Sequence, residues 1–158
     1  PQALRAGSAP APLAWAVRDL SPSPRHDLHE LFSRVIGSVA LGNTDDHLRN
    51  HGFLASRGSW TLSPAFDVNP NPDPMARRAT SIVGADTLPD EVDGLAALAE
   101  DCDLPQESAR ERMGAIADRL APWRECARRN RVPEREITMM AEAVTPRLEA
   151  LVDAARAG

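Results

Sequence analysis

The sequence contains no lysine: all 18 basic residues among its 158 are arginine. This absence excludes Schiff-base chemistry on a lysine, and it excludes a Walker A loop, whose lysine reaches the phosphates of a bound nucleotide. Glycine is also sparse, with nine residues and no G-x-G pattern, so the chain lacks a glycine-rich phosphate loop. Two cysteines, Cys102 and Cys126, are too few for a disulfide framework or a CxxC metal site, and we expect reduced thiols in a cytoplasmic protein.

Charge and hydropathy exclude two further classes of protein. The chain carries 18 basic and 23 acidic residues, a net charge of −5, whereas a dedicated nucleic-acid binder has a basic excess. No run approaches the roughly 18 apolar residues that a membrane span needs, and the N-terminus lacks the order of a signal peptide. We therefore expect no direct contact with nucleic acid and no membrane association. The length suits one domain, or one lobe of a larger one.

The first part of the chain divides into a proline-rich segment and a helix. Residues 1–26 contain five prolines, which fix φ and remove hydrogen-bond donors, so we predict a mostly extended segment with a possible short helix at 13–20. From residue 27 the apolar residues recur at helical spacing as far as residue 40, with Asp27 as the expected cap and Gly42-Asn43 as the stop.

The rest of the chain is predicted as a β-hairpin followed by helices. Two short apolar runs flank a glycine-containing turn within residues 52–62, which is typical of a hairpin. Four prolines make residues 63–74 a loop, and residues 80–83 suggest one more short strand. Helical stripes then follow over residues 88–156, with a capping box at 87–90 and kinks at Pro122 and Pro146. The fold class is therefore mainly α with a small β-hairpin.

The densest polar cluster, GNTDDHLRN at residues 42–50, follows the predicted helix directly. Asp45 and Asn50 stand five residues apart, and the hairpin between residues 52 and 62 leads on to Asp67 in the segment 63–70. Phosphoryl transfer needs one carboxylate near the acceptor hydroxyl and oxygen ligands that hold Mg²⁺ against the phosphates. The hairpin would fold Asp67 back beside Asn50, so we predict one acidic site made of Asp45, Asn50 and Asp67.

Each of these residues also has an ordinary structural interpretation when taken alone. Asp45 and Asp46 are typical helix caps or turn residues, and Asn50 is typical of an Asx turn. His47 alone would more often orient a loop by local backbone bonding than bind a metal. The combination of order and spacing favours the kinase-type site over these separate interpretations.

The strings GNTDDHLRN at 42–50 and LSPAFDVNP at 62–70 closely resemble HipA-like serine/threonine kinases, the toxins of bacterial toxin–antitoxin modules. The resemblance covers about residues 27–155. The D-x-H-x-x-N core is shared with phosphatidylinositol 3/4-kinase-like enzymes. The strings NTDDH at 43–47 and SPAFDVNP at 63–70 resemble HipA-like proteins instead. Ordinary protein kinases place a histidine two residues before the aspartate; here that position is Asn43, and His47 stands two residues after Asp45.

The resemblance implies a role for each site residue. Asp45 would be the catalytic base or position the acceptor hydroxyl, Asn50 and Asp67 would hold Mg²⁺ and thereby ATP, and His47 would orient the loop. The fold would be the C-terminal lobe of a protein-kinase-like fold over residues 27–157, with a catalytic loop at 42–50. The implied partners are a HipB-like DNA-binding antitoxin and a protein substrate, for which an aminoacyl-tRNA synthetase is the family's type of target.

One departure from the family limits this prediction. Kinases of this kind use an N-terminal lobe with a phosphate-covering loop and a lysine on ATP, and this sequence has neither. ATP binding would therefore need an N-lobe that the sequence lacks, supplied by a separate chain or by a longer protein, and we expect the chain alone to be inactive. Two alternatives stay open: a catalytically silent helical interaction module, and a metal-dependent hydrolase built on Asp45, Asp46, His47 and Asp67.

Overall fold

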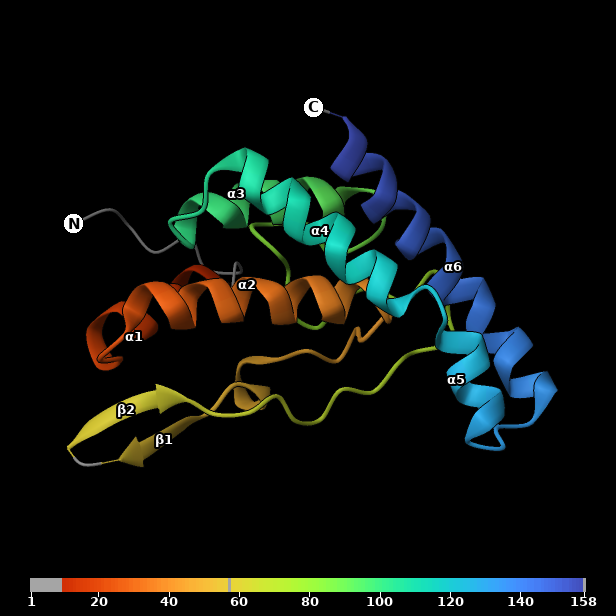
Figure 1. Cartoon of the computed structure of the whole chain (residues 1–158), viewed down its shortest axis with the longest axis horizontal. Helices are drawn as coiled ribbons and strands as arrows, with labels where there is room; N and C mark the ends of the chain where they lie inside the picture. Colours follow the sequence, from red (N-terminus) through yellow and green to blue (C-terminus); the bar gives the residue numbers. More distant parts are fainter. Residues whose placement is uncertain (1–9, 57, 158) are drawn as a thin grey trace.

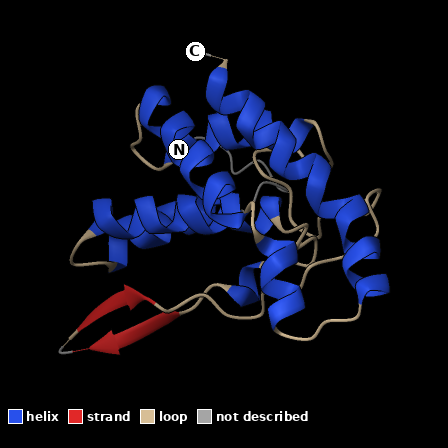
Figure 2. Ribbon diagram, turned by 45° about the vertical axis from the view of Figure 1, so that its right-hand side comes forward, coloured by secondary structure: helices blue, strands red, loops and turns tan. Residues whose placement is uncertain are grey.

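A computed structural model describes residues 10–56 and 58–157 of the chain. The elements along these residues are helices α1 (Pro10–Leu20) and α2 (Pro24–Ala40), the 3₁₀ turn η1 (Leu48–Asn50), strands β1 (Phe53–Ser56) and β2 (Ser59–Leu62), and helices α3 (Asp90–Asp101), α4 (Gln106–Leu120), α5 (Trp123–Arg129) and α6 (Glu134–Arg156). The fold is therefore mainly helical with a two-stranded antiparallel sheet, as the sequence predicts (Figure 2).

Helix α2 forms the centre of the molecule. It contacts α1, α3, α4 and α6, and α3, α4 and α6 lie on one side of it while the hairpin lies on the other (Figure 1). The helical stripe predicted from the sequence is the core: its seven members are at most 3% exposed, and they are Leu28, Leu31, Phe32, Val35, Ile36, Val39 and Ala40. Burial of this apolar stripe stabilises the packing of α2 on the neighbouring elements.

The structure confirms the short helix predicted at 13–20, but the helix begins earlier, at Pro10, and residues 24–26 are helical too, so the mostly extended segment predicted at 1–26 is wrong over most of its described part. Residues 10–20 form α1, whose Leu13, Ala14 and Val17 are buried in the same core as α2. The prolines at 10 and 12 fall in the first turn, where no intrahelical donor is needed, so they permit the helix. Residues 1–9 lie outside the described part of the chain.

Asp27 does not cap α2, because the helix begins three residues earlier, at Pro24. Its buried carboxylate instead accepts the Ser21 hydroxyl at 2.9 Å and the Leu62 N–H at 3.2 Å through the same oxygen, Oδ2. Burial alone would raise the pKa of Asp27, but hydrogen bonds from His26, Leu62 and Ser21 outweigh it and lower the pKa below its ordinary value. Asp27 thus ties β2 to the turn between α1 and α2.

The stop predicted at Gly42 is confirmed by its hydrogen bonds. The N–H of Gly42 donates to Val39 and the N–H of Asn43 donates to Ser38, which is the Schellman arrangement. Gly42 has a φ of +67°, a left-handed conformation that favours glycine at this position. The motif ends α2 sharply and directs the chain into the polar loop at 42–50.

The hairpin has the predicted position. Phe53 pairs with Leu62 and Ala55 pairs with Trp60, and Phe53 and Leu62 pack against the core. The strand suggested at 80–83 does not form; only an isolated bridge joins Ile82 and Ala85.

The helical region beyond residue 88 differs from prediction in its details. Helix α3 begins at Asp90 with no side-chain cap bond, so the capping box at 87–90 is absent. Pro122 separates α4 from α5 instead of kinking one helix, whereas Pro146 lies inside the continuous α6. None of the described helices has the length and hydropathy that crossing a membrane requires.

Replacing Asp27 by alanine tests the tie between β2 and the α1–α2 turn. The loss of hydrogen bonds to a charged group should lower the free energy of unfolding by about 1.5–3 kcal/mol at neutral pH. Because the folded-state pKa of Asp27 is lowered, this stability is present above the unfolded pKa of about 3.9 and is lost as the pH falls through the folded value. Urea unfolding between pH 3 and 7 should therefore show the two proteins converging at low pH. Asp19→Ala, at an exposed acid of α1, is the control and should change little.

Candidate functional site

The loop after α2 is pinned to the segment that follows the hairpin. The Thr44 carbonyl accepts the Ala79 N–H at 2.7 Å, and the Thr44 hydroxyl accepts the Asn71 side-chain amide at 2.9 Å. The Asn71 N–H donates to the Gly42 carbonyl at 3.0 Å. Residues 42–44 are thereby held on a rigid base, the condition under which a loop can position functional groups.

Asp45 is exposed, although the residues on both sides of it are buried. Thr44 is 6% exposed and Asp46 is 7% exposed. The chain therefore presents one carboxylate to solvent from a stretch whose neighbours are fixed in the protein. The Asp45 carboxylate is therefore accessible to a molecule bound at this loop.

Asn50 lies beside Asp45, as the five-residue spacing predicts. The turn η1 folds back so that the Asn50 side-chain amide donates to the Asp45 carbonyl at 3.1 Å. Asn50 is buried, and its own N–H donates to the His47 carbonyl at 2.9 Å. Its amide nitrogen is thus engaged by the loop, which directs the side-chain oxygen away from that bond.

Asp67 is exposed and has a φ of 55°, a conformation that few non-glycine residues adopt. Its carboxylate accepts the Asn69 side-chain amide at 2.6 Å. Its two neighbours, Phe66 and Val68, line a small cavity together with Asn50. The hairpin therefore returns the segment around Asp67 to the side of Asn50, whereas Asp67 is not among the residues that line this cavity.

His47 contributes to the loop chiefly through its backbone. Its N–H donates to the Asp45 carbonyl at 3.0 Å, and its carbonyl accepts from Asn50. The buried Nδ1 of the ring has no hydrogen-bond partner, and the ring borders a cavity lined also by Leu48, Thr80 and Ile82. In the part of the chain that the structure describes, no three His, Cys, Asp or Glu side chains are grouped to hold a metal ion.

Asp46 lies at the edge of a buried charge network. One oxygen of its carboxylate, Oδ1, lies 2.9 Å from the His51 Nε2, and the other, Oδ2, accepts from Arg78 at 3.0 Å. Burial alone would raise the pKa of Asp46, but the hydrogen bond and charge of His51, with Ser38 and Arg78, lower it below the ordinary value. The carboxylate is therefore ionised and fully engaged inside the protein.

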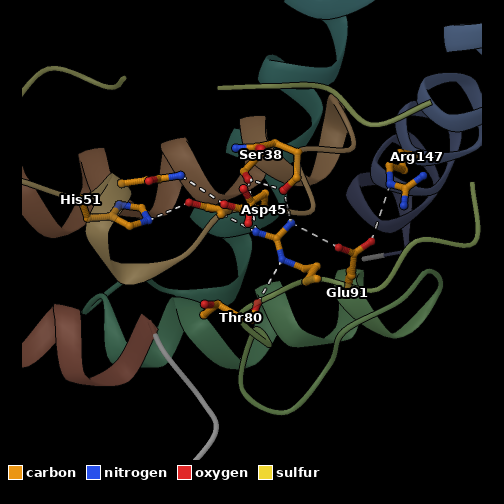
Figure 3. Close-up of polar contacts among 10 residues, drawn as sticks. Ser38, Asp45, His51, Thr80, Glu91 and Arg147 are labelled. Atoms are coloured by element: carbon orange, nitrogen blue, oxygen red, sulfur yellow. Dashed lines mark hydrogen bonds and ion pairs between the residues drawn. The ribbon is translucent and has the colours of Figure 1, made fainter. Parts of the chain in front are cut away.

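Arg78 is the centre of this network, with a side chain only 2% exposed. Besides Asp46 it donates to the Asn43 carbonyl, the Ser38 hydroxyl and the Thr80 carbonyl at 3.2–3.3 Å. Its Nη1 also lies 3.3 Å from the Glu91 carboxylate of α3. One guanidinium thus joins α2, the polar loop, the segment after the hairpin and α3 (Figure 3).

Glu91 continues the network to the last helix. Its Oε2 lies 3.7 Å from Nε of Arg147, and the two side chains are 1% and 2% exposed. Figure 3 shows the Glu91 carboxylate facing Arg147 across this gap. The sequence carries a signal for this pair: Arg147 falls on the buried stripe of α6 with Val144 and Leu151, where an arginine needs a charged partner.

The family of the chain follows from comparison with known proteins. Residues 6–124 match the family described as the HipA-like C-terminal domain, so the chain belongs to that family. The resemblance stated from the motifs is confirmed, and the match begins upstream of residue 27, which places α1 inside the domain. No curated protein sequence matches the chain.

A solved structure has a similar fold over nearly the whole chain. It is the complex of the toxin–antitoxin proteins HipA and HipB with operator DNA from Shewanella oneidensis MR-1. The TM-score is 0.61 at 18% sequence identity, and the match covers 97% of this chain and 36% of the other. The chain therefore spans about a third of the length of the protein that it matches.

Because the charge network is buried, substitutions within it should lower the free energy of unfolding far more than a substitution of Asp45. Arg78→Ala leaves Asp46 and Glu91 buried without their shared partner, which should cost about 3–5 kcal/mol of unfolding free energy. Asp45→Asn changes an exposed side chain and should alter stability by less than about 0.5 kcal/mol. Chemical denaturation followed by circular dichroism measures both. Equal stability of the two variants would contradict the buried network.

Proposed function

We propose that the chain is the C-terminal catalytic lobe of a HipA-like, ATP-dependent protein serine/threonine kinase. Asp45 acts on the acceptor hydroxyl, Asn50 and Asp67 hold Mg²⁺, and His47 orients the loop between them. The observation that carries the proposal is the exposed carboxylate of Asp45 between two buried neighbours. The backbone carbonyl of Asp45 accepts a hydrogen bond from the Asn50 side-chain amide at 3.1 Å.

This arrangement supplies what phosphoryl transfer requires of a protein. The reaction depends on positioning and on electrostatic stabilisation rather than on covalent chemistry by the enzyme. The amide oxygen of Asn50 and the carboxylate of Asp67 are hard oxygen donors of the kind that Mg²⁺ prefers, and phosphate and water oxygens complete such a site. When bound, Mg²⁺ would neutralise the charge that develops on the phosphates.

An apolar surface lies next to these polar groups. Phe66 is 47% exposed, and its ring is so close to Gly52 that a Cβ added there would lie 3.5 Å from it. Leu54 on the neighbouring strand is 54% exposed. Exposed apolar side chains near Asn50 and Asp67 would suit the base of a nucleotide whose phosphates reach these two residues.

Activity requires a second lobe that covers the other side of the bound nucleotide. The chain has no lysine and no glycine-rich loop, and it spans 36% of the HipA-type chain that it resembles. An N-terminal lobe would close the site, exclude water and strengthen the electrostatic contacts. The neighbour's complex with HipB supports a HipB-like antitoxin as a partner, and contact with DNA would then run through that antitoxin.

The hydrolase alternative loses support from the position of Asp46. A two-metal site built on Asp45, Asp46, His47 and Asp67 needs the Asp46 carboxylate as a ligand, and both of its oxygens are engaged by His51 and Arg78. The silent interaction module is distinguished from the kinase by partner dependence: a kinase lobe gains activity when a chain that supplies an N-lobe is added, whereas the module stays silent.

Phosphoryl transfer on mixing with a chain that supplies an N-lobe tests the proposal. The chain alone should bind Mg-ATP no more tightly than millimolar in calorimetry, because one face of the nucleotide is open to water. With the N-lobe, transfer of the γ-phosphate to a protein serine or threonine should appear, and Asp45→Asn should reduce its rate by about 10²-fold or more.

The matched control is Asp118→Asn, which removes the same charge from an exposed position of α4. It should leave the rate unchanged. Micromolar ATP binding by the chain alone would contradict the need for an N-lobe. Full transfer by the Asp45→Asn variant would refute the kinase assignment, and a silent mixture would favour the interaction module.

A further inference from the structure

We infer that Asp46 and Arg78 are positioning residues for the reaction at Asp45. This inference rests on the proposed function. Their buried ion pair fixes the direction in which the loop presents the Asp45 carboxylate. Glu91 of α3 contacts Arg78, and Arg147 of α6 in turn lies beside Glu91.

The first step concerns two adjacent residues with opposite surroundings. Asp45 is exposed, whereas Asp46 is 7% exposed and is held at both of its carboxylate oxygens. A carboxylate held at two oxygens, by His51 on one side and Arg78 on the other, cannot rotate without losing a charge-assisted hydrogen bond. Because the two residues share a peptide unit, fixing the Asp46 side chain restricts the backbone from which Asp45 projects.

The second step concerns the number of points at which Arg78 holds the loop. Its planar guanidinium contacts the Asn43 carbonyl before Asp45 and the Asp46 carboxylate after it. The same group donates to the Ser38 hydroxyl, which itself donates to the Asn43 carbonyl at 3.2 Å. The loop is therefore held on both sides of Asp45 and is anchored to the end of α2 through Ser38. A lysine's single ammonium does not reproduce this arrangement.

The third step concerns what holds Arg78. Its side chain is buried, so its charge needs compensation. The carboxylates of Asp46 and Glu91 contact it, and Arg147 balances the second of them, so two acids and two arginines alternate along the network. The Glu91–Arg147 contact is the loosest, since Glu91 Oε2 and Arg147 Nε lack hydrogen-bond partners. Effects on the loop should therefore weaken from Asp46 and Arg78 outward to Arg147.

A purely structural role for the network predicts something different. If the role were purely structural, substitutions in the network would lower the free energy of unfolding. They would then change amide hydrogen exchange and kcat no more than a core substitution that lowers this free energy equally. Positioning predicts a local effect: selective opening of the loop and a loss in kcat with little change in KM for ATP.

Hydrogen exchange followed by mass spectrometry on the chain provides the first readout, which needs no activity. Asp46→Asn and Arg78→Met should raise exchange in peptides covering residues 43–51 by roughly tenfold or more. Arg78→Lys is the milder variant that keeps the fold and the charge, and it should raise exchange in the same peptides to a smaller extent. Leu104→Ala removes a buried side chain outside the network and is the control for general loss of stability.

Steady-state kinetics with the N-lobe present provide the second readout. Arg78→Lys and Asp46→Asn should lower kcat by about 10- to 100-fold, the effect of a misplacement on the order of 1 Å, with KM for ATP within about twofold. Variants whose exchange and kcat change no more than in Leu104→Ala would overturn the inference.

The Asp45→Asn variant separates the two possible failures. If it loses transfer while Asp46→Asn and Arg78→Lys keep the wild-type kcat, only the positioning inference fails. If it keeps transfer, the proposed function fails, and the positioning role for that reaction fails with it.

Discussion

A buried guanidinium must be compensated, and in this protein the compensation of Arg78 determines how distant segments meet. Its partners come from α2, the loop after it, the segment beyond the hairpin and the start of α3. Breaking one of these contacts leaves a charge in the interior, at a cost far above that of an exposed ion pair. The apolar core therefore brings the helices together, whereas the charge network fixes how the polar loop lies on them.

The functional proposal follows from the contrast between exposed and buried groups in this loop. Asp45 is exposed while Asp46 is engaged in the interior, and Asn50 closes the turn on the Asp45 carbonyl. The hairpin then returns Phe66 and Val68 to the cavity beside Asn50. Membership in the HipA-like C-terminal domain family is consistent with this arrangement.

Local patterns predicted much of the fold and, within the polar loop, the position of Asn50 beside Asp45. The apolar stripe of α2, its stop at Gly42 and the hairpin depend on neighbouring residues, and the structure bears them out. Helix α1 begins three residues before the helix predicted at 13–20, because Pro10 and Pro12 occupy its first turn, where proline is tolerated. The pairing of Arg78 with Asp46 and Glu91 spans 32 and 13 residues. Such contacts depend on tertiary packing, which no local pattern encodes, so the sequence indicates neither the pairs nor their burial.

The convergence of Asn50 and Asp67 on one divalent cation is the central claim, and paramagnetic NMR measures it most directly. Mn²⁺ titrated into the ¹⁵N-labelled chain should first broaden the amide signals around residues 50 and 67 together, because the ion's effect falls steeply with distance. The substitution Asp67→Asn should abolish this joint broadening, whereas Asp73→Asn, in the same loop, should preserve it. Broadening that begins at other acidic surfaces, or that reaches only one of the two residues, would contradict the account.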